Sequence, residues 1–143
     1  MTLDRATFQE WLDRYVAAWR SYDPQAIGEL FSEEADYRYH PKDDPVHGRD
    51  AIVASWLDEP DDPGTYDGHY EPLAIDGEEH VASGWSRYFD EKGGLADEYW
   101  NIYVCRFDDD GRCRDFTEWW IRSREFARRA AETAAAGDGA HAE

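Results

Sequence analysis

The stretch DRYVAAW at residues 13–19 decides the fold of this chain, because it lies within a long run of apolar residues at helical spacing. Across residues 6–21 the apolar positions recur every three or four residues: Phe8, Trp11, Leu12, Tyr15, Val16 and Trp19. This spacing predicts an amphipathic helix with a wide apolar face. Thr7 is the expected N-cap, with Glu10 at the spacing of a capping box.

The segments that follow this helix predict two further helices and a strand. Asp23 followed by Pro24 indicates that one helix ends and another begins, because Asp caps helices and Pro is favoured at the first helical position. Residues 35–40 have the pattern of a strand that is closed by Pro41. Residues 50–57 are expected to form the third, short helix.

The second half of the chain alternates strand-like segments with turn residues. We expect strands at 66–75, 80–89, 98–107 and 114–123, separated by Gly-containing turns. Helices followed by a run of strands are typical of an α+β fold. We therefore predict a cone-shaped barrel in which three helices pack on a curved, mainly antiparallel mixed sheet. This domain is expected to span residues 1–125, and residues 126–143 should form a helix to about residue 135 and then a disordered tail.

The charge of the chain argues against several classes of partner. Its net charge is −18, which disfavours nucleic acids and anionic membrane surfaces, because both need Lys and Arg. There is no signal-like leader and no apolar stretch of about 18 residues, so we expect a cytoplasmic protein. Cys105 and Cys113 should then be reduced and structural.

Aromatic residues make up 15% of the chain, with seven Trp and nine Tyr. Tyr and Trp combine an apolar body with a polar tip, which suits a half-wet cavity. The sequence contains no P-loop, zinc-ligand spacing, calcium loop or nucleophile elbow. We therefore expect no metal and no cofactor.

Several short segments, in this order and spacing, resemble the SnoaL-like branch of the nuclear transport factor 2-like superfamily. They are RYVAAW at 14–19, Leu30-Phe31, ADY at 35–37, His40-Pro41, HGRDAI at 47–52 and RFDDDGR at 106–112. The resemblance extends over residues 7–123. It implies a conical α+β barrel with a small-molecule cavity between the helices and the concave sheet, and homodimers through the outer sheet face.

Ketosteroid isomerase, a member of that superfamily, offers a specific comparison. Its pattern needs a Tyr on the first helix, an Asp base on the first strand and a protonated Asp on a later strand. Tyr15 matches the first of these. The position of the Asp base is occupied by Tyr39 or His40, and the position of the second Asp is occupied by Tyr103. Because two of the three residues of that pattern are changed, we expect no steroid isomerisation by that mechanism.

Strand alternation separates the residues expected in the cavity from those expected outside, because successive side chains point to opposite faces. The inward set is Tyr99, Asn101, Tyr103 and Cys105 on one strand and Phe116, Glu118 and Trp120 on the last. The outward set is Trp100, Ile102, Val104, Thr117, Trp119 and Ile121, most of which suit a dimer interface.

Three residues are candidates for catalysis. His40 is a possible general base, since its ordinary pKa is near neutrality, or else it caps the end of the strand. Glu118 lies between two aromatic residues, where burial would raise its pKa, or it pairs with Arg38 or Arg87. Tyr15 and Tyr103 are candidates to stabilise an oxyanion by donating a hydrogen bond to it. Alternatively, these tyrosines hydrogen-bond to one another.

The expected ligand-binding residues are Trp19, Tyr37, Tyr39, Trp56, Tyr99, Asn101, Tyr103, Phe116 and Trp120. They suggest an apolar or aromatic ligand with oxygen groups, and a cofactor-free isomerase, cyclase or dehydratase. The alternative is a non-catalytic dimerisation module whose cavity is filled. The remaining histidines, His47, His69 and His80, are expected at the surface.

Overall fold

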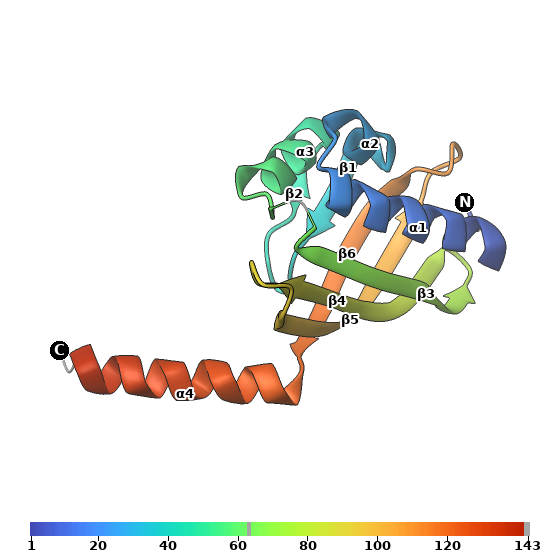
Figure 1. Cartoon of the computed structure of the whole chain (residues 1–143). Helices are drawn as coiled ribbons and strands as arrows, with labels where there is room; N and C mark the ends of the chain where they lie inside the picture. Colours follow the sequence, from blue (N-terminus) through green and yellow to red (C-terminus); the bar gives the residue numbers. More distant parts are fainter. Residues whose placement is uncertain (63, 142–143) are drawn as a thin grey trace.

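A computed structural model describes residues 1–62 and 64–141 of the chain (Figure 1). Its elements, in chain order, are α1 (Arg5–Ser21), α2 (Pro24–Glu29), β1 (Phe31–Arg38), β2 (Val46–His47), α3 (Arg49–Asp58), β3 (Tyr66–Asp76), β4 (Glu79–Phe89), β5 (Leu95–Phe107), β6 (Cys113–Arg122) and α4 (Arg124–His141). The strands form one sheet in the order β2-β1-β6-β5-β4-β3. Neighbouring strands are antiparallel, except that β1 and β6 are parallel.

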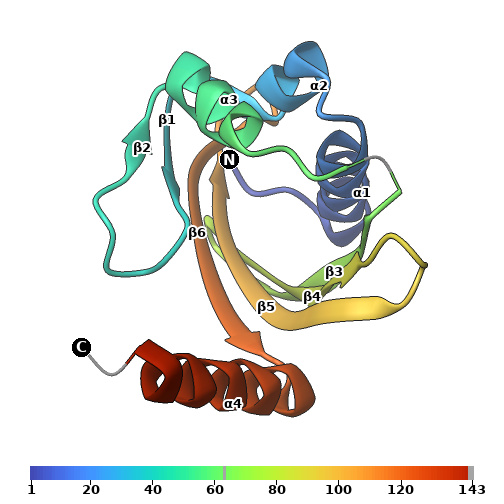
Figure 2. The ribbon, with the colours of Figure 1, turned by 60° about the vertical axis from the view of Figure 1, so that its left-hand side comes forward.

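The sheet curves around the first helix, as Figure 2 shows. Helix α1 lies along the concave face, while α2 and α3 lie together over one end of β1 and β6. The α+β class, the three N-terminal helices and the mixed sheet are therefore confirmed. The sheet curves without closing into a barrel, and its two edges are β2 and β3.

Among the three N-terminal helices, the structure differs from the sequence expectation at the N-cap of α1. Asp4, not Thr7, is the N-cap of α1, and its Oδ1 accepts a hydrogen bond from the Thr7 backbone nitrogen at 2.8 Å. The cap lies three residues earlier because Asp4 has the extended backbone that a capping residue needs. At α2 the prediction is confirmed, since Asp23 accepts from the backbone nitrogen of Gln25 at 3.2 Å.

Strand β1 starts and ends earlier than expected. It spans Phe31–Arg38, not residues 35–40, so that His40 lies beyond the strand. The short strand β2 was not predicted, because two residues carry no period that a sequence can show.

The C-terminal helix α4 is longer than expected and continues to His141. The segment is rich in Ala, which has the highest helix propensity. It extends away from the rest of the molecule beyond β6 (Figure 1), with Phe126 as its buried anchor. Residues 142–143, the last part of the predicted disordered tail, lie outside the described residues.

The core between α1 and the sheet is built from interlocking aromatic rings. Phe116 of β6 is stacked on Tyr37, with ring centroids 4.5 Å apart, and on Tyr15 at 5.4 Å. Trp11 meets Phe107 edge to face at 5.3 Å. Stacked and edge-to-face contacts are the favourable geometries for aromatic pairs, so these rings hold α1 firmly on the sheet.

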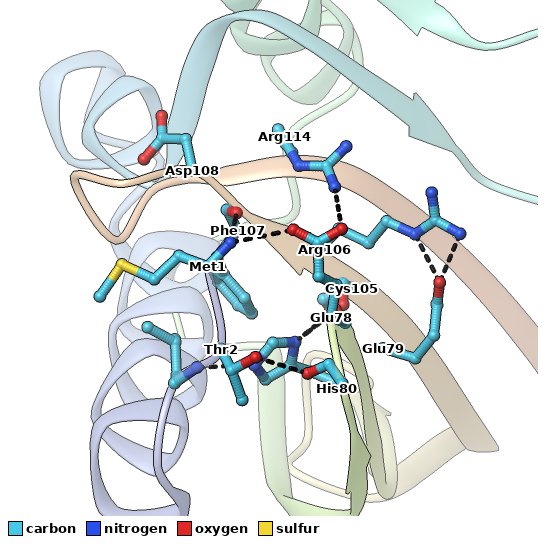
Figure 3. Close-up of polar contacts among 12 residues, drawn as sticks. Met1, Thr2, Glu78, Glu79, His80, Cys105, Arg106, Phe107, Asp108 and Arg114 are labelled. Atoms are coloured by element: carbon cyan, nitrogen blue, oxygen red, sulfur yellow. Dashed lines mark hydrogen bonds and ion pairs between the residues drawn. The ribbon is translucent and has the colours of Figure 1, made fainter.

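Polar contacts close the end of the sheet where β4 begins and β5 ends (Figure 3). The backbone nitrogen of Leu3 donates to Nε2 of His80 at 2.9 Å, and the Thr2 hydroxyl donates to the Gly77 carbonyl at 2.8 Å. The expectation that His80 lies at the surface is wrong, because the segment before α1 folds over it. Arg114 and Glu78 form an ion pair at 3.1 Å on the same side.

Two further findings bear on the sequence expectations. Cys105 and Cys113 are both buried and are not joined by a disulfide. Among the described residues, none of the helices has the length and hydropathy needed to traverse a lipid bilayer.

Candidate ligand cavity

A cavity of about 590 Å³ opens at the end of the sheet where α1 terminates. It is lined by Trp19, Tyr22, Tyr39, Glu59, Asp61, Ser86, Tyr88, Asp97, Tyr99, Asn101, Glu118 and Trp120. These side chains come from the C-terminal end of α1, the loops after β1 and α3, and strands β4, β5 and β6. The volume is within the range of small-molecule sites.

The structure brings six of the predicted site residues together in this cavity: Trp19, Tyr39, Tyr99, Asn101, Glu118 and Trp120. Asn101 and Trp120 are direct partners across β5 and β6, and Glu118 lies opposite Tyr103. The alternation of β5 and β6 therefore places the inward residues as the sequence indicated. On the other face, Trp100, Trp119 and Ile121 are exposed.

Five predicted residues lie behind the cavity, in the aromatic core: Tyr15, Tyr37, Trp56, Tyr103 and Phe116. The hydroxyls of Tyr15 and Tyr37 are 2.8 Å apart and bond to each other. Tyr103 is stacked on Tyr70, with centroids 4.4 Å apart. These rings do not reach the cavity, because α1 packs closely on the sheet along this half. The Tyr15 and Tyr37 hydroxyls are therefore engaged with each other in the core.

His40 does not belong to the cavity. It is exposed and lies beside Pro41 and Trp100 on the outer side of the sheet. Its Nδ1 accepts a hydrogen bond from the backbone nitrogen of Lys42 at 3.2 Å. The physical reason is alternation, since Tyr37 and Tyr39 point inward and the residue after them points outward. Tyr39, not His40, is the residue of this segment that faces the cavity.

Glu118 is a carboxylate in the cavity that is largely surrounded by protein and has no partner. It makes no hydrogen bond or ion pair with any residue that the structure describes. The two arginines expected to pair with it are engaged elsewhere: Arg38 with Asp115 at 3.7 Å and Arg87 with Glu98 at 2.7 Å. Burial raises the pKa of Glu118 to about 7. The carboxyl group can therefore take up and release a proton near neutral pH.

Hydrogen bonds fix several side chains around Glu118. The hydroxyls of Tyr39 and Ser55 are 2.8 Å apart, and the Tyr22 hydroxyl donates to Asp61 at 2.7 Å. The amide nitrogen of Asn101 donates to the Tyr70 hydroxyl at 2.5 Å, whereas its buried Oδ1 accepts no hydrogen bond. Burial also keeps the pKa of the Tyr39 phenol above its ordinary value, so that this group remains a donor.

Six lining residues were not predicted: Tyr22, Glu59, Asp61, Ser86, Tyr88 and Asp97. Ser86 and Tyr88 follow from the alternation of strand β4, a signal that the sequence contains. Asp97 lies in the extension of β5 toward Leu95. Tyr22 has a left-handed backbone at the end of α1, with φ of 50°, and no pattern predicts where such a side chain points.

The described residues contain no group of three His, Cys, Asp or Glu side chains that could hold a metal ion. The polar side chains that line the cavity carry carboxylate, phenol, serine hydroxyl and amide groups.

The sequence matches the SnoaL-like domain over residues 12–116. The chain belongs to the SnoaL-like domain family. Solved structures of nuclear transport factor 2-like proteins share its fold. A search of curated proteins finds no match.

Three of the similar structures illustrate the range of this fold. An NTF-2 like protein of unknown function from Burkholderia xenovorans LB400 aligns with a TM-score of 0.63 and 14% identity, covering 82% of this chain and 85% of that one. A candidate ketosteroid isomerase from Kribbella flavida DSM 17836 aligns with a TM-score of 0.63 and 16% identity, covering 86% and 83%. An NTF2-like protein of unknown function from Cytophaga hutchinsonii ATCC 33406 aligns with a TM-score of 0.60 and 16% identity, covering 82% and 98%. At these identities the likeness shows the fold alone.

Proposed function

We propose that this protein binds a small apolar or aromatic ligand with oxygen groups in the cavity and transfers a proton on it without a cofactor. Isomerisation, aldol-type cyclisation and dehydration are the reactions of this class. The observation that carries the proposal is Glu118, an unpaired carboxylate with a pKa of about 7 in an aromatic-walled cavity. A base of that pKa is half ionised at neutral pH, which is favourable for proton abstraction.

The side chains beside Glu118 support the same chemistry. Proton abstraction next to a carbonyl builds negative charge on oxygen, and a phenol that stays protonated can stabilise it. Tyr39 and Tyr88 line the cavity, and burial holds the pKa of both phenols above the ordinary value. We assign this role to Tyr88, because the Tyr39 hydroxyl donates to Ser55, which itself donates to the Ile52 carbonyl. The sequence had suggested Tyr15 and Tyr103, which are buried in the core.

A neutral carbon acid tests whether Glu118 acts as a base. In 5-nitrobenzisoxazole, removal of the ring C–H proton breaks the N–O bond and releases a coloured nitrophenolate. We expect the protein to accelerate this reaction above buffer, with a rate that rises with pH through about 7. Glu118→Gln should lower the rate by about 100-fold, the lower range for loss of a general base.

Glu71→Gln serves as the matched control, because it removes the same charge from an exposed position of β3 outside the cavity. It should retain the full rate. Equal rates for Glu118→Gln and the unaltered protein would refute the assignment of Glu118 as the base.

A second candidate function is an interaction module that pairs through the outer sheet face. The observation that favours it is an exposed apolar surface, the outer patch, formed by Trp100, Ile102, Val104, Trp119 and Ile121. Trp100 is 48% exposed, Trp119 54% and Ile121 72%. Contiguous apolar surface of this kind marks interaction sites in many proteins. The occupant we propose is a second copy of the chain, and a dimer is compatible with ligand binding on the concave side.

A further inference from the structure

The cavity presents hydrogen-bond acceptors but no cationic side chain among its described lining residues. Its charged residues are Glu59, Asp61, Asp97 and Glu118. Of these, Asp97 is already neutralised, because Nη2 of Arg122 lies 2.8 Å from its Oδ2. The other three carboxylates form no ion pair with any described residue. The cavity therefore has an uncompensated negative charge.

Aromatic rings surround this charge. The walls are formed by Trp19, Tyr22, Tyr39, Tyr88, Tyr99 and Trp120. The faces of such rings attract cations, because their π-electrons carry partial negative charge. Aromatic faces and carboxylates thus favour the same kind of ligand.

Asn101 gives an independent indication. Its side chain lines the cavity and the residue is only 4% exposed, yet its Oδ1 accepts no hydrogen bond. A buried acceptor without a donor is unfavourable. A ligand group rich in N–H donors would satisfy acceptors in this part of the cavity, whereas a carbonyl or carboxylate would not.

We propose, building on the proposed function, that the ligand of this cavity is an organic ammonium ion. Its protonated amine would pair with the carboxylate of Glu118, and its flat apolar part would lie against the aromatic walls. An anionic ligand would be repelled and would leave Glu118 without a counter-ion. An ammonium beside Glu118 would also lower the pKa of its carboxyl group, so the paired carboxylate would stay ionised at neutral pH and be a weaker base than the unpaired one.

Three probes of one shape and different charge test this inference. Tyramine, 4-propylphenol and 3-(4-hydroxyphenyl)propanoate share a phenol ring and a short chain, and they are positive, neutral and negative. We would titrate each into the full chain by isothermal titration calorimetry at about pH 8. Tyramine is expected to bind at least about tenfold more tightly than 4-propylphenol, and the anion more weakly than either.

Glu118→Gln separates the charge from the shape of the cavity. It should weaken tyramine binding about tenfold while changing the affinity for 4-propylphenol by less than about twofold. Glu71→Gln, which makes the same charge change outside the cavity, should leave all three affinities unchanged.

The possible results distinguish this inference from the proposed function. Equal affinities for tyramine and 4-propylphenol, or equal losses of both in Glu118→Gln, would overturn the ammonium ligand and leave a neutral-ligand cavity. A loss of tyramine binding in Glu71→Gln as large as that in Glu118→Gln would overturn it too, since the effect would then be that of overall charge. Absence of binding by all three probes would overturn both the inference and the proposed function.

Discussion

Glu118 couples the free energy of unfolding to pH, because its pKa is about 7 in the folded protein and 4.5 is its ordinary value. Below about pH 4.5 the Glu118 carboxyl is protonated in both the folded and the unfolded state, so it does not make the free energy of unfolding depend on pH. Between that pH and about 7 the folded state binds the extra proton, so that stability falls as pH rises. The loss is complete above about pH 7 and amounts to at most about 3 kcal/mol.

We therefore expect Glu118→Gln to be as stable as the unaltered protein at pH 4 and more stable by about 1 to 3 kcal/mol at pH 8. Urea unfolding of both proteins from pH 4 to pH 8 measures this difference. A constant difference across the pH range would show that the carboxyl of Glu118 titrates normally. The same substitution would remove the proposed base, so stability gained would accompany activity lost.

At the scale of elements, the pairing of β3 with β4 depends on a glycine. Gly84 lies opposite Tyr70, and a Cβ atom added to it would collide with the His69 carbonyl oxygen and the Tyr70 ring. Its Cβ would also lie 2.8 Å from the Tyr70 Cα, which is backbone and cannot rotate away. The two strands approach closely here because this position has no side chain.

Gly84→Ala should thus separate the strands and lower the free energy of unfolding by about 3 kcal/mol. Ser83→Ala at the next position is the control, with an expected change within about 0.5 kcal/mol. Urea unfolding at one pH compares the two variants. A loss below about 1 kcal/mol for Gly84→Ala would mean that the strands relax without strain.

At the scale of the whole molecule, the outer patch and the cavity lie on opposite faces of one sheet. Trp120 lines the cavity and also lies beside the outer patch. Its ring meets that of Tyr99 edge to face, with ring centroids 5.6 Å apart. A second copy seated on the outer patch would therefore lie next to Trp120, a residue of the cavity wall.

We expect a dimer by sedimentation velocity, and Trp100→Glu should convert it to a monomer, because the charge would be buried without a partner. Leu73→Glu changes an exposed Leu on β3 in the same way, outside the outer patch, and should remain dimeric. A monomeric unaltered protein, or a dimeric Trp100→Glu, would contradict the proposed interface.

The sequence by itself determined the fold class and the faces of the long strands. Helical spacing along residues 6–21 and alternation along β5 and β6 are local periodicities, so they can be recognised before the chain folds. The same alternation placed Glu118 and Asn101 on the concave side and Trp100 on the convex side. Applied to β4 and to the end of β1, it would also have placed Tyr88 inside and His40 outside.

Only the tertiary structure decided which inward residues reach a ligand. Tyr15 and Trp19 share one face of α1, yet the first is locked in the core and the second lines the cavity. The difference arises because Trp19, near the end of α1, lies at the edge of the core: it stacks on Trp56, with ring centroids 4.3 Å apart, and is only partly buried. That Glu118 remains without an ion pair is also decided by the tertiary structure, because Arg38 pairs with Asp115 and Arg87 pairs with Glu98. Packing distances and the choice among competing charges depend on all the elements together, and no local pattern contains them.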